Sequence, residues 1–126
     1  MYLLDTNVLI NILCAPDKLS EKVKKIVVSE KILNVSIISL WKIAIKQFIK
    51  KLNIESSIVE IKNICEERDI QILSIDENDI EKTKLLSDVH RDPFDRLIIA
   101  QAKNRKMKII TSDKNFKKYL KDVVEY

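Results

Sequence analysis

Short apolar segments alternate with amphipathic segments along the whole of this 126-residue chain. Apolar runs bounded by polar residues suit buried strands, and apolar residues repeated at helical spacing suit helices. The pattern predicts strands at 2–4, 32–35, 70–75, 108–111 and 123–124, and helices at 18–29, 37–51, 56–68, 76–86, from 92 onward and at 115–120. This alternation indicates one α/β domain over residues 1–126, with a mostly parallel sheet of about five strands sandwiched by helices.

Two features of the composition narrow the kinds of function. The chain contains no glycine, so it lacks the loops in which Walker A and dinucleotide-binding sites bring the backbone close to phosphate. The formal net charge is +4 and the pI is about 9.0, which favours a polyanionic partner such as nucleic acid. Lysines that only keep helix surfaces soluble account for many of these charges as well.

The cysteines, the histidine and the apolar runs exclude several other classes. Cys14 and Cys65 share no metal-binding spacing, and we expect two free thiols that act as small core residues. His90 is the only histidine, and no residues around it complete a zinc site or a nucleophilic triad. Apolar runs of about five residues are too short to span a membrane. Because Asp5 interrupts the first of them, no signal peptide is expected either, and we expect a cytoplasmic protein.

Three aspartates occupy positions from which a sheet would bring them together. Asp5 ends the first predicted strand, Asp113 follows the strand at 108–111, and Asp95 lies at the start of the helix that opens near residue 92. In parallel sheets, functional groups gather beyond the carboxyl ends of the strands, so we expect the three carboxyl groups to converge there. Clustered carboxylates suit Mg²⁺ or Mn²⁺, which generate hydroxide and neutralise charge on a scissile phosphate.

Helix capping is the alternative explanation for each of these acids. Aspartates at strand ends commonly cap the following helix, which accounts for Asp5 or Asp113 taken singly. Asp92 fits an N-cap that is followed by Pro93 at the first helical position. For Asp95, cap and metal ligand are balanced alternatives, and only the combination of the acids favours a site.

Four segments carry a resemblance to a known family. Leu-Leu-Asp-Thr-Asn-Val-Leu-Ile at 3–10 resembles the opening of PIN domains, and Ser-Ile-Ile-Ser-Leu-Trp-Lys-Ile-Ala-Ile-Lys at 36–46 resembles the second motif of VapC-type toxins. His-Arg-Asp-Pro-Phe-Asp-Arg-Leu-Ile-Ile-Ala-Gln-Ala at 90–102 is similar to the third motif, and Ile-Ile-Thr-Ser-Asp at 109–113 is similar to the fourth. The chain thus resembles a VapC-type PIN-domain ribonuclease over essentially its whole length.

The resemblance implies a Rossmann-like PIN fold and a toxin that hydrolyses RNA with Mg²⁺ or Mn²⁺ and is inhibited by a cognate antitoxin. It makes Asp5, Asp95 and Asp113 the catalytic and metal-binding acids. It also makes three polar residues supporting groups near the metal or the phosphate: Thr6, Asn7 and Ser112. Arg96 is then a candidate RNA contact, with an outward-facing ion pair as the equal alternative.

Position 42 departs from the family pattern. The second motif normally has glutamate after its tryptophan, whereas here Lys42 follows Trp41. Helical geometry puts Lys42 on the shoulder of an apolar stripe from which it can reach an enclosed site; the stripe is Ile38, Trp41, Ile45, Phe48, Ile49 and Leu52. An ammonium in place of a carboxylate opposes divalent-cation binding. We expect a weakened or inactivated metal site, with an ion pair from Lys42 to Asp5 or Asp95 in place of the metal.

Two functions of different classes follow. The first is a metal-dependent endoribonuclease toxin impaired by Lys42, and the second is a PIN module that binds RNA or a protein without cleaving. A receiver domain phosphorylated on aspartate is a weaker third, because Asp5 stands alone where receivers carry adjacent acids. The apolar surface of helices 18–29 and 36–52 also predicts a homodimer, with an antitoxin segment lying across or near the acidic site.

Overall fold

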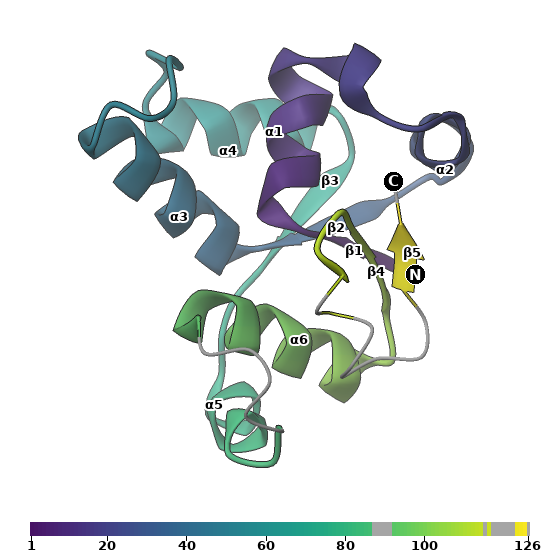
Figure 1. Ribbon diagram of the computed structural model, residues 1–126, viewed down its shortest axis with the longest axis vertical. Helices are drawn as coiled ribbons and strands as arrows, with labels where there is room; N and C mark the ends of the chain where they lie inside the picture. Colours follow the sequence, from purple (N-terminus) through teal and green to yellow (C-terminus); the bar gives the residue numbers. More distant parts are fainter. Residues whose placement is uncertain (87–91, 115, 117–122, 126) are drawn as a thin grey trace.

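A single parallel sheet organises the chain in the computed structural model, which describes residues 1–86, 92–114, 116 and 123–125. Five strands lie in the order β3-β2-β1-β4-β5 (Figure 1). They are β1 Tyr2–Leu4, β2 Leu33–Ser36, β3 Ile70–Leu73, β4 Lys108–Thr111 and β5 Val123–Glu125. The predicted α/β fold with a parallel sheet of five strands is confirmed.

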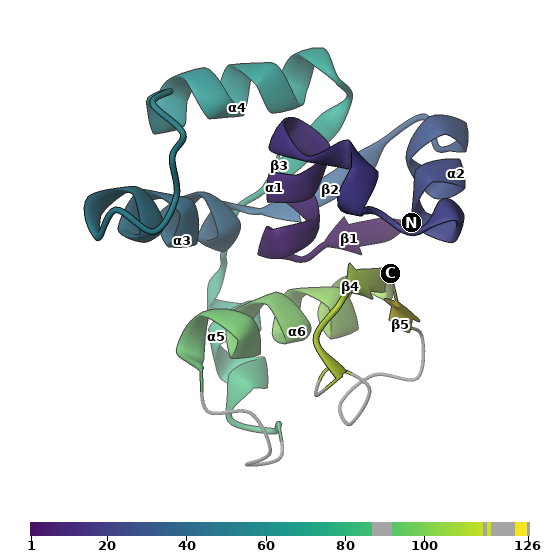
Figure 2. The ribbon, with the colours of Figure 1, turned by 45° about the horizontal axis from the view of Figure 1, so that its top comes forward.

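Helices cover both faces of this sheet, as Figure 2 shows. On one side lie α1 Thr6–Cys14, α2 Glu21–Ser29, α3 Ile37–Phe48 and α4 Ile58–Glu67, with a 3-10 turn, η1 Pro16–Lys18, before α2. On the other side lie α5 Glu77–Thr83 and α6 Pro93–Arg105. Within the described residues, no helix is long and apolar enough to cross a membrane.

Strands β1 and β4 contribute side chains to both hydrophobic cores, because successive strand residues point to opposite faces of the sheet. Leu4 and Ile110 belong to the core beneath α1 to α4, whereas Leu3 and Ile109 belong to the core against α6. All four side chains are fully buried. The middle residues of β1 and β4 are therefore apolar. Asp5 and Asp113 follow the carboxyl ends of these two strands.

Polar side chains mark where the helices begin and end. Ser57 and Asp76 open α4 and α5 with reciprocal capping boxes, and the Asp92 carboxylate accepts from the Phe94 N–H at the start of α6. The predicted cap role of Asp92 is confirmed. The chain has no glycine for its helix ends, and Lys106 takes the left-handed conformation, with φ 54°, where α6 ends.

Several sequence-based expectations are wrong in detail. The helix α1 was not expected, and Cys14 at its end is exposed, so only Cys65 is the buried core thiol. The predicted apolar stripe of α3 is only partly its buried face: Ile38 is buried, but Trp41 is 57% exposed and Phe48 87% exposed. Besides Ile38, α3 buries Ser39, Leu40 and Ile43. The predicted helix at 115–120 falls almost wholly outside the described residues, and His90 lies outside them too.

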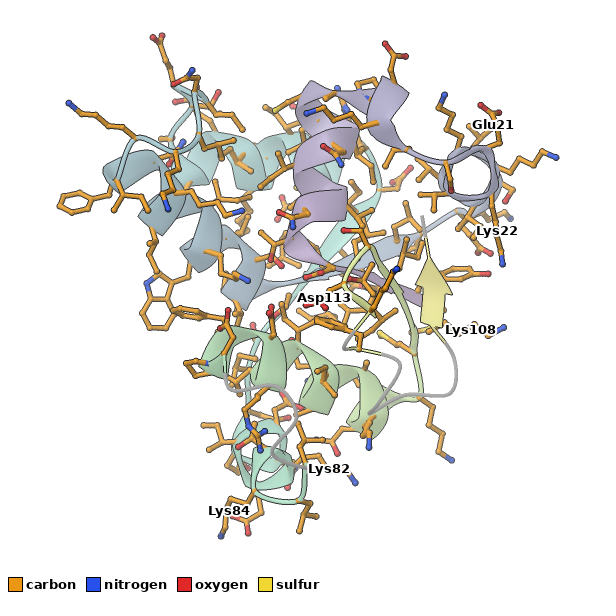
Figure 3. All side chains as sticks on the ribbon, in the orientation of Figure 1. Glu21, Lys22, Lys82, Lys84, Lys108 and Asp113 are labelled. Carbon is orange, nitrogen blue, oxygen red and sulfur yellow. The ribbon has the colours of Figure 1, made fainter. Side chains whose placement is uncertain are left out.

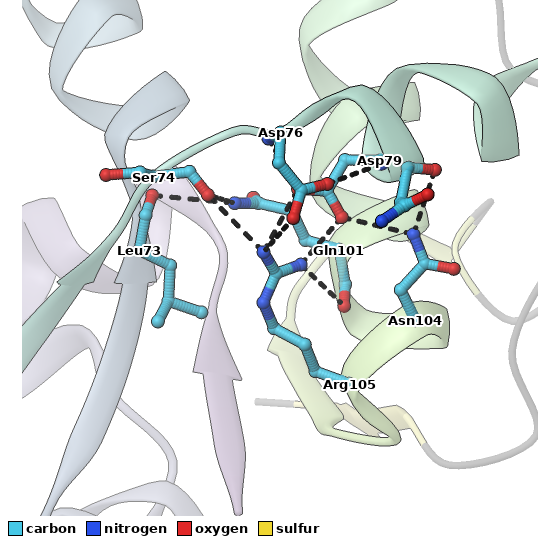
Figure 4. Close-up of polar contacts among 8 residues, drawn as sticks. Leu73, Ser74, Asp76, Asp79, Gln101, Asn104 and Arg105 are labelled. Atoms are coloured by element: carbon cyan, nitrogen blue, oxygen red, sulfur yellow. Dashed lines mark hydrogen bonds and ion pairs between the residues drawn. The ribbon is translucent and has the colours of Figure 1, made fainter.

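An ion-pair network ties α5 to α6 and to the end of β3 (Figure 4). Arg105 donates through both terminal nitrogens to the buried carboxylate of Asp79, at 2.7 and 3.0 Å. Asn104 also donates to Asp79, and the amide of Gln101 donates to the carbonyls of Leu73 and Ser74. A polar cavity of about 490 Å³ opens beside the network, away from the predicted acids. We assign this region a structural role, because its charged groups are bonded to one another.

Candidate active site

Asp5 is a buried carboxylate at the carboxyl end of β1. One oxygen accepts from the Thr6 N–H at 2.7 Å, which caps α1, and the other accepts from the Thr111 hydroxyl at 2.7 Å. The Asp5 N–H donates to the carbonyl of Ile110 on β4. Burial raises the pKa of Asp5, while the hydrogen bonds from Thr111 and Thr6 and the charge of Lys42 oppose that rise. The capping explanation therefore holds for Asp5 without excluding a site.

Thr111 joins two of the predicted acids. Its hydroxyl donates to Asp5 and accepts from the N–H of Asp113 at 3.0 Å, while the charge of Asp113 contributes to the raised pKa of Asp5. Asp113 lies just beyond the end of β4. In Figure 3 it lies inside the outline of the molecule, while the side chains of Lys82, Lys84 and Lys108 extend from its periphery. Thr111 was not among the residues predicted for the site. A polar residue closing an otherwise apolar buried strand is the signal that would have found it.

Lys42 reaches the same region from α3 and contacts the acids of α6. Its ammonium donates to Asp95 Oδ1 at 3.0 Å and lies 3.7 Å from Asp92 Oδ2. The side chains of Lys42 and Asp95 are only 19% and 10% exposed. Of the two ion pairs expected from the sequence, the structure forms the one with Asp95. Asp92 combines its capping bond with this second interaction.

The pKa shifts express how the charges share the site. Burial lowers the pKa of Lys42, but the hydrogen bond to Asp95 and the charges of Asp95, Asp92 and Asp5 outweigh it and raise the pKa. Burial raises the pKa of Asp95, the bond from Lys42 opposes this, and the charges of Asp5 and Asp92 add to the rise. The directions agree physically, because one ammonium faces three carboxylates while each carboxylate shares that ammonium with the others. Lys42 is thus firmly protonated at neutral pH.

The predicted supporting residues take different places. Thr6 is buried, and its hydroxyl lies 2.9 Å from that of Ser39, which joins α1 to α3. Asn7 is exposed and accepts from Lys46 at 3.1 Å, while Ser112 is exposed beyond β4. Arg96 donates to the backbone carbonyls of Thr83 and Leu86, so it fastens α6 to the end of α5. Ser39 was not predicted either, because its burial depends on the packing of α1 against α3.

A divalent cation does not fit this arrangement. In the part of the chain that the structure describes, no three acidic, histidine or cysteine side chains are grouped so as to hold a metal ion. The Lys42 ammonium already contacts Asp95, and a metal bonded to that carboxylate at roughly 2 Å would lie against a second positive charge. The acids lie at one edge of the sheet, and the positive charge among them comes from Lys42.

Removing the Thr111 hydroxyl tests how strongly the protein supports Asp5. In Thr111→Val, a buried carboxylate loses a hydrogen-bond donor, so the free energy of unfolding should fall by about 2 kcal/mol. Thr83→Val is the matched control, because among the described residues the Thr83 hydroxyl donates only to the carbonyl of Ile80, in an exposed hydrogen bond. That control should change by less than about 0.5 kcal/mol. Urea unfolding measures both, and equal losses would contradict a supporting role for Thr111.

Comparison with known proteins agrees with the fold. Residues 2–121 match the PIN domain, and the chain belongs to this family. A comparison with curated proteins found no match.

Several solved structures share the fold, and one of them is a toxin–antitoxin complex. VapBC2 from Rickettsia felis, bound to a DNA fragment from its promoter, has a chain with a TM-score of 0.70 and 16% identity, over 99% of this chain and 96% of that one. A toxin–antitoxin complex from Klebsiella pneumoniae gives 0.69 and 18%, over 98% and 96%. FitAcB from Neisseria gonorrhoeae gives 0.65 and 22%, over 100% and 96%. At these identities the likeness shows the fold alone.

Proposed function

We propose that residues 1–126 form a VapC-like toxin, a PIN-domain endoribonuclease whose hydrolysis of RNA is weakened or abolished by Lys42. The observation that carries the proposal is the 3.0 Å contact between Lys42 and Asp95, at the edge of the sheet where Asp5 and Asp113 also lie. The net charge of +4 supports an RNA substrate. Membership of the PIN family supports a nuclease.

For a form of this site without the Lys42 ammonium, such as the Lys42→Glu variant, we assign Mg²⁺ or Mn²⁺ as the metal. Its catalytic acids and metal ligands are Asp5, Asp95 and Asp113. Carboxylate oxygens are the ligands that these ions prefer. Thr6, Asn7 and Ser112 are assigned as polar support around them. In the present sequence we derive no chemical step through a metal, because Lys42 contacts the carboxylate that would bind it.

The partners proposed are a cognate antitoxin and a second copy of the chain. A similar structure from Klebsiella pneumoniae is a toxin–antitoxin complex, which supports an antitoxin. Large apolar side chains stand exposed on α3 and α4, including Trp41, Phe48 and Val59, and such surfaces commonly mark protein interfaces. Sedimentation of the purified chain tests the homodimer, and a monomer at every concentration would rule it out.

An RNA cleavage assay tests the proposed function. The protein and its Lys42→Glu variant are incubated with single-stranded RNA and Mg²⁺ or Mn²⁺, with EDTA as the metal-free control. We expect little or no cleavage by the protein itself and metal-dependent cleavage by Lys42→Glu, because the change removes the competing ammonium and adds a carboxylate. A folded Lys42→Glu protein that leaves a broad panel of RNAs intact would overturn the nuclease assignment.

The second candidate is a PIN module that binds RNA or a protein without cleaving. The same ion pair favours it, because a carboxylate held by Lys42 is not open to a metal. The Lys42→Glu protein distinguishes the two candidate functions. The second candidate predicts that this variant binds RNA in a gel-shift assay and yields no cleavage products. Binding that is equal in Lys42→Glu and in the original protein, with intact RNA in both, would select it.

A further inference from the structure

Two adjacent contacts join α3 to the start of α6. The Lys42 ammonium lies 3.0 Å from Asp95, and the ring of Trp41 meets Phe94 edge-on, with centroids 4.8 Å apart and planes at 82°. Neighbouring residues of one helix thus contact neighbouring residues of the other. We call these four residues the α3–α6 clamp.

The clamp connects the two helical layers across the carboxyl edge of the sheet. Leu40 and Ile43 of α3 pack in the core beneath α1 to α4, whereas Ile98 and Ile99 of α6 pack in the opposite core. Figure 2 shows α3 and α6 on the two sides of the sheet. The edge between these layers holds several acids, and Asp5, Asp92 and Asp95 all act electrostatically on Lys42. Carboxylates gathered there would repel one another without a cation.

We propose that Lys42 is a tethered counter-cation that holds the α3–α6 clamp closed and makes the fold independent of a divalent metal. A metal ion bound by acids from both layers would join them in the same way, but it would have to be supplied from solution. The lysine brings its charge with the chain. This role concerns the stability of the fold and stands whether or not the protein cleaves RNA.

The surroundings of the ammonium point to this role rather than to binding a substrate phosphate. Its charge interacts with Asp95 and Asp92 at 3.0 and 3.7 Å, and the side chain is four-fifths buried. A phosphate approaching it would also approach three carboxylates, which repel a second anion. The ammonium is therefore committed to the internal acids.

Thermal unfolding of a neutral variant tests the counter-cation first. Lys42→Met keeps an unbranched apolar stem and removes the charge. Lys62→Met is the matched control, because Lys62 pairs with Glu66 at 3.8 Å on the exposed surface of α4. Breaking the partly buried pair should lower the melting temperature by roughly 5–10 °C, and breaking the exposed pair by less than about 2 °C. Equal melting temperatures of Lys42→Met and Lys62→Met would overturn the proposal.

A Mg²⁺ titration tests independence from metal, with no RNA present. Trp41 is the only tryptophan of the chain and belongs to the clamp, so its fluorescence reports on the contact between α3 and α6. In the original protein, millimolar Mg²⁺ should change neither the Trp41 emission nor the melting temperature. In Lys42→Glu, which places like charges in the clamp, Mg²⁺ should raise the melting temperature and alter the emission, and EDTA should reverse both.

Each outcome decides the proposal. A rise in melting temperature with Mg²⁺ that is as large in the original protein as in Lys42→Glu would show that a metal enters despite Lys42, and the proposal would be wrong. If Lys42→Glu does not fold, the comparison of Lys42→Met with Lys62→Met still decides the matter. A stable clamp in a protein without nuclease activity would sink only the proposed function, because the two assays share no readout.

Discussion

In a Lys42→Glu background, Asp5→Asn should lower RNA cleavage by about 100-fold or more, whereas the same change beside Lys42 should alter it by less than about threefold. Charge stabilisation by a bound metal contributes several kcal/mol to such reactions, and it depends on the carboxylates that hold the ion. Asparagine keeps an oxygen that can accept from Thr6 or Thr111, so the fold around Asp5 should survive. The loss of RNA cleavage in Asp5→Asn then reports on the missing negative charge of the Asp5 carboxylate.

Single-turnover cleavage by the four proteins of this cycle measures the effect. Strong non-additivity is expected, because either the lysine at position 42 or the Asp5→Asn change is sufficient by itself to prevent a metal from binding. Ser112→Ala in the same background is a useful comparison, since Ser112 is exposed beyond β4 and carries no charge. Equal, modest losses from Asp5→Asn in both backgrounds would show that Asp5 supports the fold and takes no part in cleavage.

Arg105→Met should lower the free energy of unfolding by about 3 kcal/mol, the largest stability effect we expect from any one surface-reaching side chain. The change leaves Asp79, which is 1% exposed, without the guanidinium that donates to both its oxygens. Lys84→Met is the matched control, because Lys84 pairs with Glu81 at 2.8 Å on the exposed surface of the same region. It should cost less than about 1 kcal/mol.

The pH dependence of this loss gives an independent check. Burial alone would raise the pKa of Asp79, but hydrogen bonds from Arg105, from the Asp76 N–H and from Asn104 outweigh it and hold the pKa below its ordinary value of 3.8. Because the pKa of Asp79 is lower in the folded than in the unfolded protein, its carboxylate stabilises the fold at pH values above the unfolded pKa. That contribution disappears as the pH falls through the folded pKa. The difference between Arg105→Met and the original protein should therefore be largest near neutral pH and shrink below pH 3.8. A difference that stays constant down to acid pH would mean that packing, rather than charge, accounts for the loss.

The parts of the site that follow from local sequence were predictable. Asp5 follows an apolar strand, and Asp92 precedes Pro93 at a helix start, so each position could be placed without knowing the fold. Because the strands are parallel, the shared edge of Asp5 and Asp113 followed from the sheet. The helix α1 was missed because its apolar residues, at positions 8–10, 12 and 13, form an almost continuous run that shows no clear helical period.

The remaining features depend on how distant elements cross. The sequence restricted the ion-pair partner of Lys42 to Asp5 or Asp95. The choice between them depends on the contact of α3 with α6, which brings together Lys42 and Asp95, 53 residues apart in the chain. Trp41 and Phe48 lie at helical spacing and were assigned to the buried face, yet the sheet contacts a different side of α3. Periodicity identifies an apolar stripe, but it does not distinguish a core face from an exposed one.

The most direct test of the account is a crystal structure of the protein grown with Mn²⁺, with anomalous diffraction used to locate the metal. The account predicts that the Lys42 ammonium stays within hydrogen-bonding distance of Asp95 and that no Mn²⁺ peak appears between Asp5 and Asp95. In crystals of Lys42→Glu under the same conditions, the peak should appear there. A Mn²⁺ ion bound by Asp5 and Asp95 in the original protein, with Lys42 turned away from both, would contradict the central claim.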